Sequence, residues 1–494
     1  MIDLTVARIA EIVGGRLSDI GAEEAESTRV TGTVEFDSRA VTPGGLFLAL
    51  PGARSDGHDF APAAVAAGAA AVLAARPVGV PAIIVPPAAA ADAHAGVLEH
   101  DADGSGAAVL AALAKLAGVV AAELVAGGLR IVGITGSSGK TSTKDLVAAV
   151  LRPLGEVVAP PGSFNNELGH PWTVLRATRD TDFLVLEMSA RHRGNIAALA
   201  AIAPPSIAVV LNVGTAHLGE FGSREMIALT KGELVEAVPA SGVAILNADD
   251  VLVAAMSSRT VARVVTVGCN PAADIRAENV VLDELARPRF RLCAPGGEVD
   301  VALAVHGEHQ VGNALSAAAV ALECGGSLPQ LAAALATAAP ASRRRMEVHT
   351  RPDGVTIIND AYNANPDSMR AGLQALAVMA RSGSGSRSWA VLGEMAELGE
   401  DSITEHDRVG RLAVRLDISR LVVVGTGRPM SAMHHGAVME GSWGPESTMV
   451  PDADAALALL RAELAVGDVV LVKASNAAGL GPLADALAEQ SEQT

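Results

Sequence analysis

The chain has 494 residues, of which half are hydrophobic and only 2% aromatic, and its formal net charge is −18. The length predicts about three domains of ~150 residues each, and the acidic balance argues against nucleic-acid binding, which needs clustered basic side chains. The three cysteines, Cys269, Cys293 and Cys324, lie far apart without metal-ligand spacing, which indicates reduced thiols in a cytoplasmic protein.

No segment predicts insertion into a membrane. The first dozen residues include three charged side chains, so they lack the apolar core of a signal peptide. The most apolar stretch, residues 107–129, carries Lys115 and Glu123 near its middle, which is unfavourable for a transmembrane helix. We therefore expect a soluble protein.

The first 100 residues are expected to form a small α/β domain, with short apolar strands at 45–50 and 82–85. Residues 88–106 are rich in Ala, Asp and Gly and are expected to link this domain to a helix over 107–125.

A phosphate-binding loop is the strongest motif of the chain. Residues 133–141 read GITGSSGKT, after an apolar run at 129–134 and before a helical pattern at 143–151. In such a loop the backbone N–H groups surround phosphate oxygens, Lys140 can reach the terminal phosphates, and Thr141 can hold Mg²⁺. Ile134 replaces the first glycine of the usual pattern. A chance glycine-rich turn is the alternative, but the strand–loop–helix context favours ATP binding.

The remainder of the chain alternates apolar β-branched runs with helical patterns, which predicts doubly wound parallel sheets. A domain boundary is expected near 325–345, which contains two prolines and three consecutive arginines, and the SGSGSRS stretch at 382–388 predicts a flexible loop. Strands are expected at 183–187, 207–212 and 242–246 in the second domain, and at 355–359, 388–392, 420–424 and 468–472 in the third.

Two polar residues follow strands of the second domain. Glu187 ends one strand, where a carboxylate beside the phosphate loop can bind Mg²⁺ or act as a base; a surface glutamate is the alternative. His217 lies in a glycine-rich loop after the next strand, and either a ligand role or a packed histidine fits the pattern. Lys231, on a helical segment, has only the pattern of a solvated surface lysine.

Three further features belong to the third domain or its boundary. One arginine of 343–345 could clamp phosphate, or all three could be solvated. Tyr362, the only tyrosine, follows a strand in the turn 360–369 and could stack on a base or simply pack. Lys473 also follows a strand and could meet an anionic group or lie in solvent.

These segments, in this order, resemble the Mur ligase family of ATP-dependent amide-bond synthetases. The most diagnostic stretch is DAYNANPDSM at 360–369, and supporting stretches are FNNELG at 164–169, GEMAELG at 393–399 and VKAS at 472–475. The resemblance covers nearly the whole chain. It implies three α/β domains: a UDP-substrate-binding domain (1–100), a central doubly wound ATPase-like domain (101–328), and a C-terminal Rossmann-like domain that serves as lid and amino-acceptor site (329–494).

The resemblance also implies an activity. ATP would phosphorylate the carboxylate of a UDP-N-acetylmuramoyl-tripeptide, and D-alanyl-D-alanine would attack the acyl phosphate, in a monomer with two Mg²⁺ ions. The lysine that matches Lys231 is carbamylated in the family. The implied roles are ATP binding for Gly136, Ser137, Ser138, Gly139, Lys140, Thr141, Ser142, Asn313, Arg345, Asp360 and Tyr362; metal binding and catalysis for Thr141, Glu187, His217 and carbamylated Lys231, with Lys140; and substrate binding for Ser38, Asn165, Asn166, Asn365 and Lys473.

The chain departs from the family pattern at Gln310, Ser189 and Asn195, where Asn, Gly and Glu are common. The departure at Gln310 puts its contact with the base in doubt. Alternative functions are a relative that adds a different acceptor, such as the third amino acid, folylpolyglutamate synthesis, and a nucleotide-binding partner protein without catalysis. A motor or transporter ATPase lacks support, because no strand ends in the apolar run and Asp that such proteins use for Mg²⁺.

Overall fold

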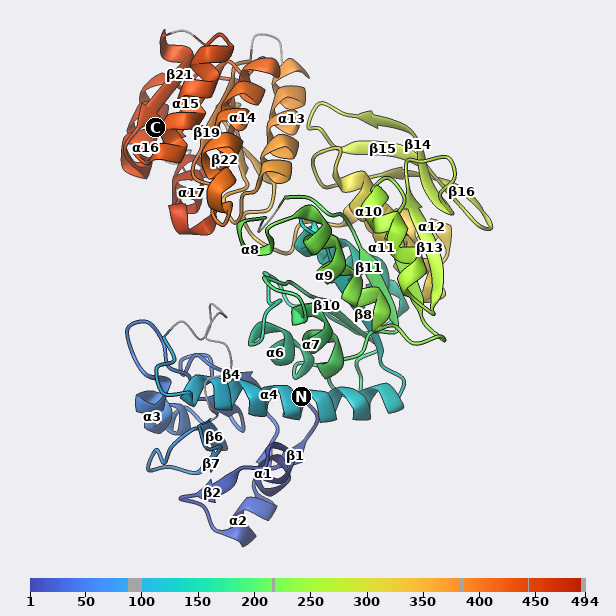
Figure 1. The fold of residues 1–494 in the computed structure, drawn as a ribbon, viewed down its shortest axis with the longest axis vertical. Helices are drawn as coiled ribbons and strands as arrows, with labels where there is room; N and C mark the ends of the chain where they lie inside the picture. The colour runs from blue at the N-terminus through green and yellow to red at the C-terminus, as the bar shows by residue number, and fades with distance from the viewer. Residues whose placement is uncertain (88–99, 216–217, 383–385, 443, 490–494) are drawn as a thin grey trace.

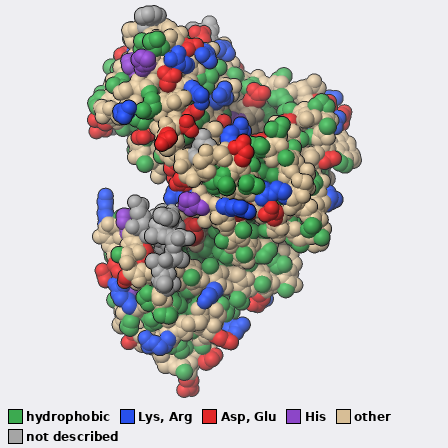
Figure 2. All heavy atoms as spheres, viewed as in Figure 1, with side chains coloured by type: hydrophobic (Ala, Val, Ile, Leu, Met, Phe, Trp, Pro, Cys, Tyr) green, Lys and Arg blue, Asp and Glu red, His purple; other side chains and the backbone are tan. Residues whose placement is uncertain are grey.

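The computed structural model describes residues 1–87, 100–215, 218–382, 386–442 and 444–489, and it shows three α/β bodies stacked along the long axis of the molecule (Figure 1). The expected three-domain α/β fold is therefore confirmed. The N-terminal and C-terminal bodies lie at opposite ends, and Figure 2 shows the surface indented between them on one side.

The N-terminal body contains a five-stranded sheet in the order β2-β7-β6-β5-β4 and a small β1-β3 ribbon. Its strands are short because turns rich in Gly and Pro follow almost every one. The elements are β1 (Leu4–Thr5), α1 (Val6–Val13), β2 (Arg16–Ser18), α2 (Ala22–Ser27), β3 (Arg29–Val30), β4 (Val34–Glu35), β5 (Leu46–Leu48), a 3₁₀ turn (Gly57–Phe60), α3 (Ala61–Ala66), β6 (Ala71–Ala74) and β7 (Ala82–Ile84).

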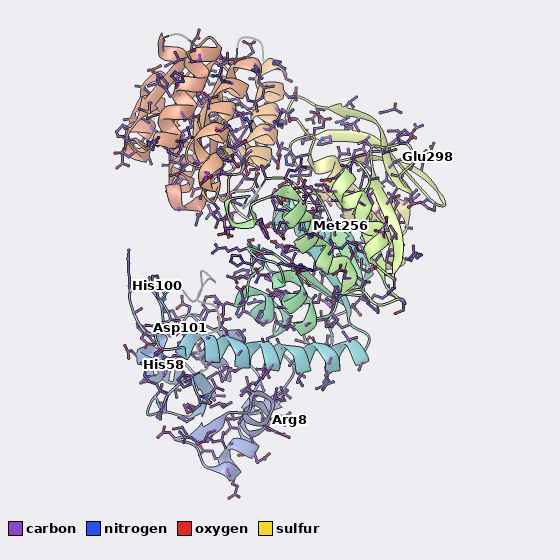
Figure 3. The ribbon with its side chains drawn as sticks, in the orientation of Figure 1. Arg8, His58, His100, Asp101, Met256 and Glu298 are labelled. Atoms are coloured by element: carbon purple, nitrogen blue, oxygen red, sulfur yellow. The ribbon has the colours of Figure 1, made fainter. Side chains whose placement is uncertain are left out.

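Helix α4 (Ser105–Ala126) joins this body to the central one. Asp101, labelled in Figure 3, accepts hydrogen bonds from the Gly106 and Ala107 N–H groups at the start of this helix. The helix is long and apolar enough to span a membrane, but slightly more than half of its most apolar window is buried inside the protein. It packs against α1, α6 and α7, which is the arrangement of a core helix.

The central body is built on a nine-stranded sheet in the order β16-β15-β14-β13-β12-β11-β8-β10-β9, parallel from β9 to β14 and antiparallel beyond. Alternate residues of β10 face opposite cores: Leu184 packs with α4 and α7, and Val185 packs with α5 and α11. The strands are β8 (Arg130–Thr135), β9 (Val157–Val158), β10 (Phe183–Glu187), β11 (Ile207–Val210), β12 (Val243–Asn247), β13 (Arg263–Gly268), β14 (Ile275–Leu282), β15 (Pro288–Ala294) and β16 (Gly297–Ala302).

Helices cover both faces of this sheet. They are α5 (Lys140–Leu151), α6 (Gly169–Val174), α7 (Asn195–Ile202), α8 (Leu218–Phe221), α9 (Arg224–Glu236), α10 (Val251–Ala254), α11 (Gln310–Glu323) and α12 (Leu328–Thr337), with 3₁₀ turns at Arg152–Leu154 and Ala255–Arg259. Strand β8 lies between β10 and β11. The chain adds β9 and β10 on one side of β8 and then adds β11 to β14 on the other side. Such a switch point opens a crevice at the carboxyl ends of the strands.

The C-terminal body has a six-stranded sheet in the order β17-β18-β22-β19-β20-β21, in which only β17 is antiparallel. Separate apolar clusters cover its two faces. Its elements are β17 (Glu347–Thr350), β18 (Thr356–Asn359), α13 (Pro366–Ser382), β19 (Ser388–Leu392), α14 (Ser402–Arg415), β20 (Arg420–Val424), α15 (Arg428–Glu440), β21 (Ser447–Val450), α16 (Ala453–Glu463), β22 (Val469–Lys473) and α17 (Gly481–Ala488), with 3₁₀ turns at Gly399–Asp401, Gly444–Glu446 and Asn476–Ala478.

The expected strands at 183–187, 388–392 and 420–424 are confirmed with the same bounds, and the others differ by one or two residues at an end. Two linkers were too long: residues 105–106 belong to α4, and Ser382 and Ser388 belong to α13 and β19. Residues 88–99 and 383–385 of these linkers lie outside the described residues. The expected boundary at 325–345 contains α12, which packs on α5 and β16 of the central body.

Candidate active site

A cavity of about 1290 Å³ lies between the carboxyl ends of the central strands and the C-terminal body. The phosphate loop, the loops after β10 and β11, and the start of α13 all contribute to its walls. The cavity therefore occupies the crevice that the order of the strands predicts.

The phosphate loop bends sharply at Gly139, whose φ of +82° is favourable for glycine, and α5 starts directly afterwards at Lys140. The expected helix at 143–151 thus begins three residues earlier, which brings its N–H groups to the loop. Lys140 Nζ donates to the Gly136 carbonyl over 2.7 Å. Burial lowers the pKa of Lys140 to about 8, against the opposing effect of the Glu187 carboxylate.

Glu187 is buried at the end of β10, so the alternative of a surface glutamate is wrong. Its Oε2 accepts hydrogen bonds from Ser163 Oγ over 3.1 Å, Asn165 Nδ2 over 3.3 Å and Thr141 Oγ1 over 3.3 Å. Its Oε1 is buried without any hydrogen-bond partner. A buried carboxylate oxygen without a donor is costly, and it is the kind of ligand that a hard divalent cation takes.

Lys231 lies on α9 and is only 4% exposed. The pattern-based interpretation of a solvated lysine is therefore wrong. Burial, and to a smaller extent the Lys140 ammonium, hold the pKa of Lys231 well below its ordinary value. An amine in this environment is readily neutral, and a neutral amine is the reactive form.

Asn313 contacts the phosphate loop from α11. A Cβ at Gly139 would lie 2.8 Å from Asn313 Oδ1, so a larger residue there would have to displace the Asn313 amide. Asn313 Nδ2 donates to Gln310 Oε1 over 2.9 Å, and both side chains are buried. The unusual Gln310 thus fixes the orientation of the Asn313 amide.

Arg345 reaches the loop from the segment that enters the C-terminal body. Its guanidinium lies 3.4 Å from Thr141 Oγ1 and stacks over the Tyr362 ring at 4.3 Å. The residues on both sides of Arg345, Arg344 and Met346, have positive φ angles of 60° and 51°, which costs energy for residues other than glycine. The interpretation of Arg343–Arg345 as a fully solvated run is therefore wrong for Arg345.

Lys473 is 1% exposed and donates to Asp360 Oδ2 over 2.6 Å and to the Asn363 carbonyl over 3.0 Å. The second Asp360 oxygen accepts from the Met346 N–H. The alternative of a solvated lysine is therefore wrong, and this ion pair holds the turn after β18 against the end of β22. Burial lowers the pKa of Lys473, and the Asp360 carboxylate opposes this effect.

Three polar contacts join the C-terminal body to the loops of the central one. Asn365 Nδ2 lies 3.5 Å from the Ser137 carbonyl, and Asp367 Oδ2 accepts from the Thr215 N–H over 3.3 Å. Arg191 pairs with Glu397 over 3.0 Å. The turn 360–369 thus lies directly on the phosphate loop.

The structure brings most of the candidate residues to one place, but not all of them. The cavity is lined by Ser137, Ser138, Gly139, Lys140, Thr141, Ser142, Asn165, Asn166, Asn313, Arg345, Asp360, Asn365 and Lys473. Ser38 lies in the N-terminal body, in the turn after β4, and is not among the lining residues. His217 lies outside the described residues.

Sequence reasoning missed Ser163, Arg191 and Asp367, each of which bonds to a candidate residue or joins the two bodies. The two departures after Glu187 also have local partners: Ser189 Oγ donates to the Asn165 carbonyl, and Asn195 Oδ1 accepts from the His192 N–H. Within the described part of the chain, no three His, Cys, Asp or Glu side chains converge as a metal site.

Family models match most of the chain. The model described as the Mur ligase family, catalytic domain, matches residues 32–118; the Mur ligase middle domain matches 134–321; and the Mur ligase, glutamate ligase domain, matches 344–476.

Two curated relatives carry the same description, UDP-N-acetylmuramoyl-tripeptide–D-alanyl-D-alanine ligase. The protein of Mycobacterium tuberculosis (strain ATCC 25618 / H37Rv) is 74% identical over 99% of this chain and 98% of its own length. The protein of Escherichia coli (strain K12) is 36% identical over 86% of each chain.

Solved structures agree with this. A crystal structure of MurF from Acinetobacter baumannii covers 99% of both chains with a TM-score of 0.81 at 28% identity. The MurF ligase from Thermotoga maritima, solved in complex with ADP, covers 94% of this chain and 98% of its own, with a TM-score of 0.72 at 27% identity.

Proposed function

This chain belongs to the Mur ligase family, and from that premise we propose that it joins D-alanyl-D-alanine to UDP-N-acetylmuramoyl-tripeptide with the use of ATP, which yields the pentapeptide precursor of peptidoglycan. The observation that carries the proposal is the sequence similarity to relatives of that description, which are 74% identical over 99% of this chain and 36% identical over 86% of it. A phosphate loop that lines the cavity and whose Thr141 contacts the buried Glu187 carboxylate supports it.

The chemistry has two steps. The tripeptide carboxylate attacks the γ-phosphorus of ATP, so an O–P bond forms, the bond to the β-phosphate oxygen breaks, and ADP leaves. The amine of the dipeptide then attacks the acyl carbon; the tetrahedral intermediate expels inorganic phosphate, and the new amide nitrogen loses a proton. Activation is needed because a carboxylate is a poor electrophile towards an amine.

The residues of this chain have distinct tasks in that scheme. The loop N–H groups and Lys140 hold the phosphates, and Arg345 extends the positive charge from the other side of Thr141. Asn313, braced by Gln310, and Tyr362 are placed for the nucleoside end. The contact between Asn365 and Ser137 brings the two bodies together at the cavity. Closure there would keep out water, which hydrolyses an acyl phosphate.

The donor set at Glu187 fits Mg²⁺. The orphaned Oε1 of Glu187 and the Thr141 hydroxyl are hard oxygen ligands in one buried place. Thr141 and Glu187 would hold one ion, and His217 with carbamylated Lys231 a second. When bound, the ions offset negative charge on the phosphoryl oxygens. A buried Lys231 with a lowered pKa suits carbamylation, since the neutral amine is the form that reacts with CO₂.

We also propose that the N-terminal body, with Ser38, holds the UDP end of the substrate, that Asn165, Asn166 and Lys473 contact the remaining substrate groups, and that a monomer acts in the cytoplasm. Size-exclusion chromatography with light scattering tests the monomer. The free thiols suit a reducing compartment, and cell fractionation tests it.

The decisive experiment measures phosphate release from ATP with Mg²⁺, UDP-N-acetylmuramoyl-tripeptide and D-alanyl-D-alanine, each omitted in turn. We expect release only with all components present, together with a product of pentapeptide mass. If the protein is folded and binds ATP but releases no phosphate, then either D-alanyl-D-alanine is not its acceptor or the protein is not a catalyst. Phosphate release with a single amino acid in place of the dipeptide would indicate that the protein is a family member that uses a different acceptor.

A further inference from the structure

Helix α13 presents one polar face to the cavity. Asp367, Arg370 and Gln374 line the cavity at spacings of three and four residues, which places them on one side of a helix. The opposite side of α13, which includes Leu373 and Leu376, is buried in the core of the C-terminal body.

The polar face carries a negative and a positive charge in a fixed order. Asp367 lies at the phosphate-loop end, since its Oδ2 accepts from the Thr215 N–H. Gly214 permits this approach, because a Cβ there would lie 1.9 Å from the same oxygen. Arg370 lies one turn further along, about 4.5 Å along the helix axis. The acid is therefore nearest to the phosphoryl-transfer centre.

Arg370 is a cation without a described partner. The other basic side chains of the C-terminal body that line the cavity have partners: Lys473 pairs with Asp360, and Arg345 contacts Thr141 and Tyr362. Among the described residues, no hydrogen bond or ion pair joins Arg370 to another side chain, and the residue is exposed. In an acidic chain, such a side chain inside a cavity is suited to an anionic ligand group.

We propose that Asp367 and Arg370 bind the two ends of the dipeptide acceptor, with Asp367 beside the ammonium group and Arg370 on the terminal carboxylate. This inference rests on the proposed function and names the residues of its acceptor site. The amine must lie at the phosphate-loop end because it attacks the acyl phosphate, and that is the end at which Asp367 stands.

The spacing agrees with a dipeptide. Helix neighbours three residues apart have Cβ atoms about 5–6 Å apart, and two extended residues span at most about 7 Å. A single amino acid spans at most about 3.5 Å and matches this spacing less well than a dipeptide does. Arg370 thus selects for acceptor length as well as for a free carboxylate.

Arg193 is an alternative binding partner for the acceptor carboxylate. Arg193, in the loop after β10, also lines the cavity and has no described partner. Because Arg193 belongs to the central body, it lies on the side that binds ATP and the tripeptide. We therefore expect Arg193 to leave recognition of the acceptor carboxylate unchanged.

The test compares D-alanyl-D-alanine with its C-terminal amide, which lacks the carboxylate charge, in steady-state assays of phosphate release. The variants are Arg370→Gln, Arg370→Lys and Arg193→Gln, with Arg461→Gln on the outer surface of α16 as the matched control. KM for ATP is measured alongside, and thermal unfolding confirms that each variant is folded.

We expect the unchanged protein to have a KM for the amide roughly 10- to 100-fold above that for the dipeptide, the worth of a charge-assisted hydrogen bond. Arg370→Gln should raise KM for the dipeptide to that of the amide and leave KM for ATP unchanged, and Arg370→Lys should restore part of the difference. The assignment would be overturned if Arg370→Gln still had a lower KM for the dipeptide than for its amide, or if Arg193→Gln lost this difference in KM. Absence of turnover in the unchanged protein would instead reject the proposed function.

Discussion

Glu187 occupies a position that is unfavourable for an isolated carboxylate. One of its oxygens accepts three hydrogen bonds, while the other is buried without a donor. Nothing in the fold requires a charge at the end of β10, since the preceding strand residues are apolar and fully packed. The unsatisfied oxygen is thus a cost that function explains better than stability does.

The substitution Glu187→Gln should therefore separate stability from activity. The amide keeps the shape but removes the buried charge, so we expect the free energy of unfolding without ligands to rise by about 1 kcal/mol. Ligase activity should fall by at least about 100-fold, as for loss of a metal ligand. Thermal unfolding and phosphate release measure the two effects, with the exposed Glu23→Gln as control. A less stable variant with full activity would refute this interpretation of Glu187.

Lys231 gives a second prediction at the residue scale. Lys231→Ala should lose most activity, because it removes the carbamate that would complete the second metal site. Short-chain carboxylic acids such as acetate should restore part of the activity by placing a carboxylate in the space that the side chain leaves. Initial rates with and without added acid measure this, and Lys115→Ala, on the exposed side of α4, is the control. Near-normal activity of the unsupplemented variant would exclude the carbamate.

At the scale of elements, the loop after β19 depends on a buried histidine of α14. His406 is fully buried; its Nδ1 donates to the Ser402 carbonyl over 2.6 Å and its Nε2 accepts from the Met395 N–H over 2.9 Å. The bond from Met395 requires an unprotonated Nε2, and therefore the neutral ring. The loop that it anchors carries Glu397, the partner of Arg191 across the two bodies.

His406 should make stability depend on pH. Burial lowers the pKa of His406 below its ordinary value of 6.5, against the opposing effect of the Ser402 carbonyl. Below pH 6.5 the unfolded chain therefore binds a proton that the folded chain refuses, and the free energy of unfolding falls as the pH falls.

His406→Leu removes that titration together with a hydrogen bond. At pH 7.5 we expect the variant to be less stable by about 1–3 kcal/mol, because the Met395 N–H loses its acceptor. At pH 5.5 the gap should narrow. Urea unfolding at both pH values measures this difference in the free energy of unfolding. The exposed His435→Leu is the control, and its free energy of unfolding should match that of the unchanged protein at both pH values. A gap that widens on acidification would mean that the folded chain binds the His406 proton more tightly than the unfolded chain does, contrary to this prediction.

A structural feature can be predicted from this sequence when the residues that determine it are close together in the chain. Buried parallel strands such as 183–187 read as apolar runs, so both their place and the polar residue after them were predictable. β14 and β16 were missed because their solvent-facing residues break the apolar run. Lys231 and Lys473 were open to misinterpretation for a related reason: burial of a lysine is decided by tertiary packing, and the local sequence carries no trace of it.

Contacts between distant segments form the other limit. Arg345 approaches Thr141 through two strained neighbours, and Ser163 reaches Glu187 from a loop 24 residues away. Neither follows from periodicity or a motif. The resemblance to the family located Arg345, but the geometry that makes one arginine of three different from the others appears only in the folded chain.

For the whole molecule, the two interfaces of the central body differ in kind. The N-terminal body shares one apolar cluster with the central sheet through α4, and Trp172 Nε1 donates to the Val34 carbonyl across that interface. The apolar clusters of the C-terminal body consist of its own residues except for Ala286 of the central body, and its described contacts with the central loops are largely polar. Polar contacts of this kind separate at little cost, so the C-terminal body is the one that we expect to move, with a hinge in residues 338–346.

The closed arrangement depends on two glycines that meet across that interface. A Cβ on Gly219, in α8, would lie 2.7 Å from Gly399 Cα, and the reverse is also true. Any larger side chain at 219 must push the bodies apart. Because Gly219 is exposed and lies outside the apolar clusters, its replacement should spare the folding of each body.

Gly219→Val should therefore hold the molecule open. In the presence of ATP and both substrates, we expect X-ray scattering to give a larger radius of gyration than for the unchanged protein, whose radius should shrink on ligand addition. Activity should fall by about 100-fold, since an ångström of misplacement at the reacting atoms has that effect, while thermal unfolding stays similar. Gly21→Val, at a position with open space around it, is the control. A variant that closes and turns over normally would show that the contact between these glycines is not required for catalysis.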